Sequence, residues 1–539
     1  MKNKAIRLHP RDNVGVALSN LENLEAILVD GEKYTVTHAI PAKHKFALKE
    51  LSTGSEILMY GVTIGEATQP ISKGEPITLT NIRHKASPYS LSYGQYEWNP
   101  LPSLDKSFMG YLREDGQVGT ANYWLVFPLV FCENQNIQTL QEAFEIALGK
   151  KKVNPYVDLI LSEIHSVDFS EKIQSTPKSS GLNTTFENID DVRFITHQLG
   201  CGGTRRDAQT LCRLLAGYVN HPNVAGATVL SLGCQNAEFR LLEERLNEIQ
   251  WDAKKPLIHC DQQDLGTTKA LLQFAIKKTV EGLKSANQVK RSLQPISKLV
   301  IGLECGGSDG FSGISANPVL GRVSDLVISN NGSAILSEFP ELCGAEQNLI
   351  NRCKEKETAE KFIHLMKTYD ADAKAVGSGF DMNPSPGNIK DGLLTDAMKS
   401  LGAAKKGGLA PVADVLDYTE YIQRPGLNLL CTPGNDVEST TGLASAGANI
   451  ILFTTGLGTP TGNPICPVIK VSSNDAVADK MPDIIDFSTG GVISGEKSVE
   501  ECGDELLDLV LQVASGEIKT KAELNRNFDF IPWKRGVSL

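Results

Sequence analysis

The sequence lacks any apolar run long enough to cross a lipid bilayer, which takes about 20 residues. The longest candidate, Tyr123–Phe131, is short and contains Pro128, so it predicts a buried strand instead. The N-terminus carries cationic residues, but no apolar segment follows them, so no secretory signal peptide is expected. We therefore expect a cytoplasmic protein without a membrane partner.

Concentrated positive charge is also missing. The formal net charge is -11, and no long block of Lys and Arg stands out. Nucleic-acid binding needs a dense basic surface against the phosphate backbone, so no nucleic-acid partner is expected. The acidic balance does not exclude a carboxylate substrate, because a few local cations or a metal can override the global field.

Nucleotide-binding motifs are absent as well. No G-x-x-x-x-G-K-[ST] motif occurs, and Gly456-Leu457-Gly458 lacks the spacing and the downstream acid of a dinucleotide fingerprint. We therefore expect no nucleotide cofactor. The eleven cysteines are scattered and form no C-x-x-C pair. Without a signal peptide they are expected to be reduced.

The 539 residues exceed what one hydrophobic core normally organises, so several domains are expected. Residues 1–86 alternate short apolar segments with glycine-containing turns, which predicts a small, mostly β module. Residues 87–107 are rich in Ser, Pro, Tyr and Trp and predict an extended connector that packs through its aromatic side chains. The strands expected in the module are Gly15–Leu18, Ala26–Val29, Tyr34–Val36, Ile57–Tyr60 and Ile77–Leu79.

From residue 108 onward, short apolar runs alternate with helical stretches, which predicts βαβ units and mostly parallel sheets. A polar stretch between 287 and 294 predicts a boundary near residue 290, giving domains 108–290 and 291–539. The expected fold class is therefore α/β, with the small β module in front. The expected strands are Arg193–Thr196, Thr228–Leu232, Lys298–Leu303, Leu427–Leu430 and Asn449–Phe453; the expected helices are Leu159–Ser166, Gln209–Tyr218, Lys269–Leu283 and Ala359–Lys367.

Each of these five strands leads into a loop that combines Gly with Cys, Thr, Ser, Asp or Asn. Ligands of open α/β sheets bind beyond the carboxyl ends of the strands. Glycine lets backbone N–H groups approach a ligand, and helix N-termini favour anions. One such loop alone would be explained by turn formation, but five loops of the same kind predict a shared site. The loops are 197–207, 233–236, 304–313, 431–436 and 454–464.

Three cysteines occupy equivalent places in these loops. Cys201, Cys234 and Cys305 each lie just past a strand and beside glycine. Such thiols could converge as ligands of a soft or borderline metal, or of an iron–sulfur cluster. The alternative is that each cysteine packs as a small apolar side chain.

The β module contributes histidines. His38, His44 and His84 lie within one small unit. Imidazoles suit iron(II), manganese(II) or zinc(II), and also proton abstraction near neutral pH. The module is therefore a second candidate source of metal ligands or of a catalytic base.

Six segments of the chain resemble the altronate and galactarate dehydratase family, and they follow the family's order. The resemblance implies an N-terminal β-clip module of the SAF type, followed by a large α/β catalytic region. It also implies a hydro-lyase that converts a hexonic or hexaric acid to a 2-keto-3-deoxy product with a divalent metal, iron(II) first and manganese(II) second. The segments are Gly110–Trp124, Leu199–Asp207, His221–Gln235, Glu304–Gly321, Asn383–Leu393 and Ala446–Asn474.

Within the family, the segment His44–Leu48 and the segment lengths resemble the altronate branch. The expected reaction is therefore dehydration of D-altronate to 2-keto-3-deoxy-D-gluconate; galactarate dehydratases and sulfolactate lyases are the alternatives. One departure concerns the family pattern V-H-x-H-N, which here reads Ile77–Asn81 and contains no histidine. His84 is the candidate substitute. A non-catalytic sugar-acid binding protein is the alternative from another class, and a homo-oligomer stays open.

The reaction removes a C2 proton and a C3 hydroxyl. A metal chelated by the substrate carboxylate and 2-hydroxyl would stabilise the enediolate, while a base takes the proton and an acid assists the hydroxide. We expect His44 and Asp309 to be catalytic, and Arg113 or Arg205 to pair with a carboxylate, with a domain-interface salt bridge as the alternative for Arg113. The expected substrate-binding residues are Arg113, Arg205, Ser308, Asn317, Ser385 and Asn388, and the expected metal ligands are His44, His84, Cys201, Cys234 and Cys305.

Overall fold

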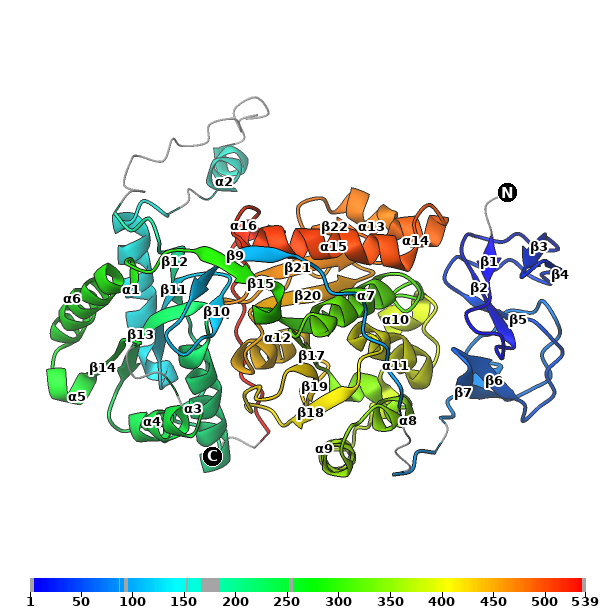
Figure 1. Cartoon of the computed structure of the whole chain (residues 1–539), viewed down its shortest axis with the longest axis horizontal. Helices are drawn as coiled ribbons and strands as arrows, with labels where there is room; N and C mark the ends of the chain where they lie inside the picture. The colour runs from blue at the N-terminus through cyan, green and yellow to red at the C-terminus, as the bar shows by residue number, and fades with distance from the viewer. Residues whose placement is uncertain are drawn as a thin grey trace.

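The chain forms three bodies whose order in space differs from their order in sequence (Figure 1). The N-terminal β module lies at one end, residues from about 107 to 290 form the opposite end, and the C-terminal half lies between them. Among the described residues no helix is both long and apolar enough to span a bilayer. This computed structural model describes residues 4–86, 88–91, 96–151, 154, 156–165, 185–249, 251 and 255–535.

The N-terminal module consists of short antiparallel strands around its own apolar core. The strand expected at Ala26–Val29 is confirmed, but the one expected at Ile77–Leu79 is wrong. Ile77 is buried in the core, whereas the side chain of Asn81 accepts a hydrogen bond from the N–H of Thr78 at 2.8 Å and closes a turn there. The strands are β1 (Ala5–Ile6), β2 (Val14–Ala17), β3 (Ala26–Val29), β4 (Glu32–Thr35), β5 (Lys45–Ala47), β6 (Glu56–Met59), β7 (Val62–Ala67) and β8 (Ile82–Arg83).

The second body is built on a four-stranded parallel sheet with the order β12-β11-β13-β14. The apolar run at Tyr123 is a wholly buried strand, as expected, and it ends at Pro128. The strands are β11 (Tyr123–Pro128), β12 (Asp191–Phe194), β13 (Val224–Ser231) and β14 (Leu257–Asp261). The helices are η1 (Phe131–Glu133), α1 (Asn134–Ala147), α2 (Tyr156–His165), α3 (Arg205–Asn220), α4 (Phe239–Glu248), α5 (Gln262–Leu265) and α6 (Thr268–Ala286).

The C-terminal half is built on a seven-stranded sheet in which every neighbouring pair is parallel, with the order β18-β19-β17-β16-β20-β21-β22. The predicted α/β class with mostly parallel sheets is therefore confirmed. The strands are β16 (Val300–Cys305), β17 (Ser333–Leu336), β18 (Val412–Leu416), β19 (Gly426–Leu430), β20 (Ile450–Thr455), β21 (Val468–Ser472) and β22 (Phe487–Ser488).

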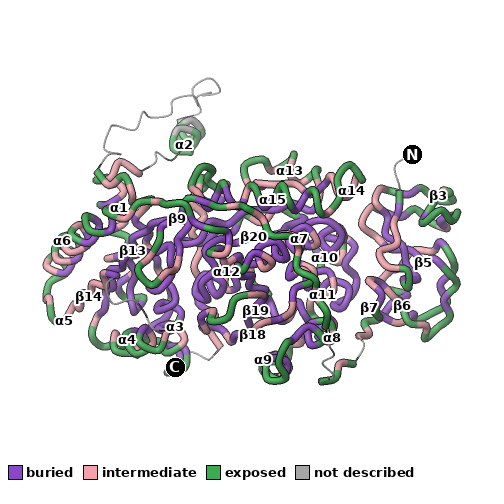
Figure 2. Tube along the Cα trace, in the orientation of Figure 1, coloured by how far each residue is buried: buried purple, intermediate pink, exposed green. Residues whose placement is uncertain are grey.

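Helices cover this sheet, and the buried trace in Figure 2 runs through its strands, whereas exposed residues lie mainly on outer segments such as α9. Helix α7 packs against α15, and both contribute to the largest apolar core. The helices are η2 (Ile296–Lys298), α7 (Ala316–Ser329), η3 (Phe339–Leu342), α8 (Glu346–Asn351), α9 (Lys356–Ala375), η4 (Phe380–Met382), α10 (Pro386–Lys390), α11 (Asp396–Ala404), η5 (Lys405–Gly407), α12 (Asp436–Ser445), α13 (Asp475–Lys480), α14 (Gly490–Ser494), α15 (Val499–Ala514) and α16 (Lys521–Asn525).

Two further segments tie the bodies together. In the connector, Tyr89 and Trp98 pack partly buried against the core of the C-terminal half, as its aromatic content predicts. A small antiparallel sheet, β10-β9-β15, pairs residues from both sides of the boundary expected near 290. That boundary falls between α6 and β15 and stays a prediction. The strands of this sheet are β9 (Ser107–Leu112), β10 (Val118–Gly119) and β15 (Ser292–Pro295).

Candidate active site

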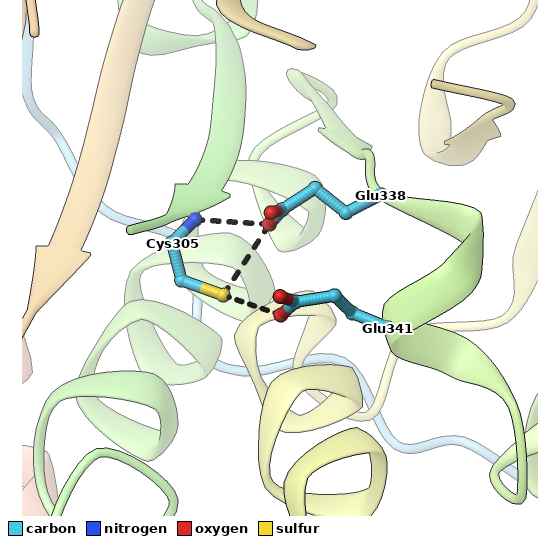
Figure 3. A group of neighbouring side chains, drawn as sticks. All are labelled: Cys305, Glu338 and Glu341. Carbon is cyan, nitrogen blue, oxygen red and sulfur yellow. Dashed lines mark hydrogen bonds between the residues drawn. The ribbon is translucent and has the colours of Figure 1, made fainter. Parts of the chain in front are cut away.

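A buried cluster of titratable side chains lies where β16 and β17 end. Cys305 is the last residue of β16, and Glu338 and Glu341 follow β17 (Figure 3). The Sγ atom of Cys305 lies 3.3 Å from Oε2 of Glu338 and 3.0 Å from Oε2 of Glu341. The backbone N–H of Cys305 also donates to Oε2 of Glu338 at 3.0 Å. The parallel pairing of β16 and β17 brings these residues together, since both strands end at the same edge.

Local backbone geometry explains why both carboxylates point to the same place. Glu341 lies in the 3-10 helix η3, and residues three apart on such a helix lie one above the other. Glu338 precedes η3 with φ of 69°, in the left-handed region that non-glycine residues seldom adopt. Its N–H donates to Oγ1 of Thr432 at 2.8 Å, which holds this conformation in place. Backbone strain of this kind is often found at functional sites.

Two buried lysines balance the carboxylates. The Nζ of Lys406 lies 2.8 Å from Sγ of Cys305 and 2.7 Å from Oε2 of Glu338. The Nζ of Lys399 lies 2.5 Å from Oε1 of Glu341. Both lysines come from the segment α11–η5, seven residues apart, so they project from one side of it. The cluster therefore gathers a thiol, two carboxyl groups and two amines away from water.

Neighbouring residues shift the pKa values of Glu338 and Glu341 in opposite directions. Burial and the nearby charge of Glu341 raise the pKa of Glu338. Burial also disfavours the charged form of Glu341, but Lys399 and Lys406 outweigh it and lower the pKa of Glu341. Burial, Glu338 and Glu341 raise the pKa of the Cys305 thiol well above its ordinary value. Two carboxyl groups with opposite shifts are the usual arrangement for holding and releasing a proton.

The same cluster has the composition of a metal site. The ligand atoms of Cys305, Glu338 and Glu341 all lie within 4.8 Å of one another, and all three residues are buried. A sulfur with two carboxylates suits a borderline divalent cation, provided that the thiol is deprotonated. The cluster could therefore hold a divalent metal. A cation and the ammonium of Lys406 would compete for the sulfur of Cys305 and for Glu338.

In the described part of the chain, Glu304 of β16 and Lys470 of β21 each have a buried polar atom without a hydrogen-bond partner. Glu304 accepts hydrogen bonds from Ser337 and Ser439 at 2.6 Å each through Oε2, while its buried Oε1 has no hydrogen-bond partner there. The buried Nζ of Lys470 likewise has none and lies 3.3 Å from the ring centroid of Phe453. Burial lowers the pKa of Lys470 to about 7. Orphaned buried groups of this kind call for a ligand, a water or a catalytic role.

The N-terminal module reaches the loop that follows β16. The Nζ of Lys43 lies 2.9 Å from Oδ2 of Asp309 and 3.1 Å from Oδ1 of Asp391. The next residue, His44, is half-buried, and its Nε2 lies 3.1 Å from the carbonyl oxygen of Lys390. Lys45 is fully buried and donates to the carbonyl of Gly392 at 2.6 Å. His44 and Asp309, both predicted to be catalytic, therefore lie at the same contact between the module and the C-terminal half.

Both oxygens of the fully buried Asp309 carboxylate have hydrogen-bond or ion-pair partners. Its Oδ1 accepts hydrogen bonds from the N–H and Oγ of Ser312 at 2.9 Å and from Oγ of Ser473 at 2.9 Å. Asn474 donates to its Oδ2 at 3.2 Å, on the side where Lys43 also lies. These contacts order the loop and hold Lys43, while the catalytic role expected for Asp309 stays a prediction.

Several predicted substrate-binding residues come together around this loop, but their side chains already have partners. Asn388 donates to the carbonyl of Ser308 at 2.7 Å and forms a capping box with Ser385 at the start of α10. Asn317 donates to the carbonyl of Gly402 at 3.0 Å and accepts from Thr454 at 2.9 Å. Ser308 is buried in the same loop as Asp309.

The remaining predicted residues lie elsewhere. Arg113 donates to the carbonyl of Pro222 at 2.7 Å and to Oδ1 of Asn122 at 2.9 Å within the second body, and its pairing with a substrate carboxylate stays a prediction. Arg205 is exposed in the first turn of α3. Cys201 and Cys234 are exposed in loops of the four-stranded sheet, a different sheet from that of Cys305. His38 and His84 are exposed in the module.

Three family models cover almost the whole chain. The SAF domain of altronate/galactarate dehydratases matches residues 3–85, and the second domain of D-galactarate dehydratase/altronate hydrolase matches residues 110–287. The C-terminal domain of D-galactarate/altronate dehydratases matches residues 296–538. The chain belongs to the altronate/galactarate dehydratase family. The predicted family, the SAF-type module and the hydro-lyase class are thereby confirmed.

Full-length relatives support the same assignment. The altronate dehydratases of Escherichia coli (strain K12) and Bacillus subtilis (strain 168) are each 34% identical to the chain, and the matches cover 99% of both partners. The galactarate dehydratase (L-threo-forming) of Escherichia coli (strain K12) is 29% identical, over 96% of this chain and 93% of that protein. The similarity thus extends through all three bodies of this dehydratase-family chain.

The sequence reasoning missed most of the buried cluster. Glu338, Glu341, Lys399 and Lys406 were not among the expected site residues, although Cys305 was. A signal was present in Ser337–Glu341, where two glutamates three residues apart flank a proline after a short apolar run. The run itself, Ser333–Leu336, was not expected to be a strand, so its position beside β16 could not be inferred.

Proposed function

We propose that this chain removes water from D-altronate and forms 2-keto-3-deoxy-D-gluconate at the carboxyl edge of the seven-stranded sheet. The observation that carries the proposal is the buried pair Glu338 and Glu341, whose pKa values are shifted in opposite directions beside Cys305. The full-length similarity to two altronate dehydratases favours altronate over galactarate, since the galactarate dehydratase shares fewer identical residues.

The proposed metal is iron(II), with manganese(II) as the alternative, held by Cys305, Glu338 and Glu341. When bound, such a cation acts as a Lewis acid for the charge that develops on the substrate carboxylate as the C2 proton leaves. Lys399 and Lys406 lie at the same carboxyl groups and supply positive charge toward an anionic substrate. The low dielectric around these buried amines strengthens that attraction.

His44 is the proposed base. A carbonyl oxygen only accepts, so the contact with Lys390 assigns the proton to Nε2 and leaves Nδ1 unprotonated in the neutral ring. Burial lowers the pKa of His44, which keeps the imidazole neutral at pH 7. Nδ1 can then take the C2 proton.

The test compares substrates and variants under anaerobic, reducing conditions. The protein would be stripped with a chelator, reloaded with iron(II) or manganese(II), and supplied with altronate, galactarate or sulfolactate while keto-acid formation is measured. We expect turnover of altronate that depends on the metal. Equal turnover by the stripped and the reloaded protein would contradict the metal role, and turnover of galactarate alone would contradict the substrate.

A matched pair of variants tests the site itself. Glu338→Gln should lower kcat at least about 100-fold, because it replaces a charged ligand of the proposed metal with a neutral amide. Glu346→Gln is the control, since Glu346 is a buried glutamate with a raised pKa that accepts from the N–H of Gly344 and lies outside the cluster. Wild-type kcat in Glu338→Gln would overturn the assignment.

A further inference from the structure

Three cysteines follow three neighbouring strands of the four-stranded sheet. Cys132 lies in η1 directly after β11, Cys201 lies in the loop after β12, and Cys234 lies in the loop after β13. Strand β11 is paired with β12 on one side and with β13 on the other, and all three are parallel. The carboxyl ends of the three strands therefore lie at one edge of the sheet, and the three cysteines lie in the segments that follow that edge.

Hydrogen bonds join the three loops directly. The N–H of Phe131 donates to the carbonyl of Leu199 at 3.0 Å, and the N–H of Ala237 donates to the carbonyl of Gly200 at 3.0 Å. Asn236 donates through its side chain to the carbonyl of Cys201 at 2.9 Å. Gly200 has a positive φ of 102°, and a Cβ there would lie 2.0 Å from the carbonyl oxygen of Leu129. Glycine at this position therefore permits the close approach of the loops.

Exposure sets these cysteines apart from the others. Of the eleven cysteines in the chain, Cys132, Cys201 and Cys234 are the exposed ones, while the other eight are buried or half-buried. Unpaired cysteine is among the most buried residue types, because it packs as a small apolar group. Three exposed thiols at one edge of one sheet are therefore not explained by packing. A ligand shared by all three is the simplest chemical reason for them.

The spacing and surroundings decide which ligand fits. A single metal ion needs its ligand atoms close together. In the described part of the chain, the one set of three ligand atoms within 4.8 Å of one another belongs to Cys305, Glu338 and Glu341. The sulfurs of the three exposed cysteines are therefore farther apart than the ligands of one metal ion. A polynuclear iron–sulfur cluster spaces its thiolates more widely. Its negative charge would face the N-terminus of the 16-residue helix α3, whose first residues, Arg205 and Arg206, are exposed.

We propose that Cys132, Cys201 and Cys234 bind an iron–sulfur cluster at the carboxyl edge of the four-stranded sheet. Three thiolates leave one iron of a four-iron cluster without a protein ligand, so an oxygen ligand from solvent or from a sugar acid can occupy that position. The site replaces the set Cys201, Cys234 and Cys305 expected from the sequence, because Cys305 belongs to the other sheet. It does not depend on the metal proposed for the cluster at Cys305.

The experiment uses the full chain, purified anaerobically and reconstituted with iron(III), sulfide and excess dithiothreitol, whose thiols supply the electrons that reduce half of the iron. We expect about four irons and as many acid-labile sulfides per chain, with broad absorption near 400 nm. Cys132→Ser, Cys201→Ser and Cys234→Ser should each lose most of the absorption and sulfide. Because these side chains are exposed, the variants should fold, which circular dichroism would check. Cys343→Ser, a half-buried thiol of the C-terminal half, is the control and should keep the wild-type spectrum.

Two outcomes would overturn the proposal. One is reconstituted protein that holds no acid-labile sulfide, including protein that binds iron alone. The other is a spectrum that survives in each of the three serine variants. Cys305→Ser separates the two sites, since it should leave the absorption and sulfide content unchanged even if the function proposed for Cys305 fails. Loss of sulfide in Cys305→Ser with retention in Cys132→Ser would restore the set expected from the sequence.

Discussion

The Nζ atom of Lys406 lies 2.8 Å from the Sγ atom of Cys305, and both side chains are buried. The same amine lies 2.7 Å from Glu338, so one lysine joins the thiol to a carboxyl group. Residues 101 positions apart in sequence are thereby held in one charge-balanced cluster. The consequences of this arrangement can be measured in both stability and turnover.

Removing the amine of Lys406 should lower the free energy of unfolding. Lys406→Met leaves Glu338 and Cys305 buried without their shared cation, and breaking a buried pair in this way typically costs about 3–5 kcal/mol. The loss would appear as a lower urea midpoint and as loss of turnover. Lys405→Met is the neighbouring control, because Lys405 lies over the ring of Tyr60 rather than at the cluster. Equal stability of Lys406→Met and wild type would contradict the pairing.

Lys470 predicts a dependence of stability on pH. Burial lowers its folded-state pKa to about 7, while the unfolded chain keeps the ordinary value of 10.5. Between these values the unfolded chain binds more protons, so stability rises with pH. The contribution is about 2 kcal/mol between pH 7 and pH 9. Urea titrations at pH 7 and pH 9 would measure the free energy of unfolding, and Lys470→Met should lack the increase that the wild type shows between them. An equal increase in the variant would show that Lys470 does not cause it.

The contact between Lys43 and Asp309 should hold the N-terminal module to the C-terminal half. Asp309→Asn can place an amide N–H opposite Lys43 and Asn474, which are themselves donors to this side chain. The lost hydrogen bonds to a charged group should lower the free energy of unfolding by about 2–3 kcal/mol. Asp391→Asn removes the more exposed partner of Lys43 and should cost less than about 1 kcal/mol. Denaturation curves of the two variants would test this order, and the reverse order would refute it.

His44 should appear in the pH profile of the reaction. Because burial lowers its pKa, kcat/KM should fall only when the pH drops below the ordinary histidine value of 6.5. His44→Gln should lose about 100- to 10,000-fold in kcat and lose the acid limb of the profile. His38→Gln changes an exposed histidine of the same module and should leave both unchanged. Full turnover in His44→Gln would refute the role as base.

The sequence by itself determined the class of the fold and the edge of the sheet at which the proposed site lies. Alternation of apolar runs with helical stretches predicted parallel sheets, because each parallel connection needs a crossover. Glycine-rich loops after strands such as β16 located polar groups at the carboxyl edge, and the family segments indicated a dehydratase. Short strands in the module were less predictable, since Ile77 is as apolar as a strand residue but lies beside a turn.

Only the tertiary structure decided which side chains share a site. The sheet order places β16 between β17 and β20, so Cys305 meets Glu338 and Glu341 rather than Cys201 or Cys234. Lys399 and Lys406 join the cluster from a helical segment far along the chain. Sequence spacing carries no information on strand order, and the pKa shifts follow from burial, which depends on how the bodies pack. The physical reason is that strand pairing and burial are properties of the folded chain as a whole.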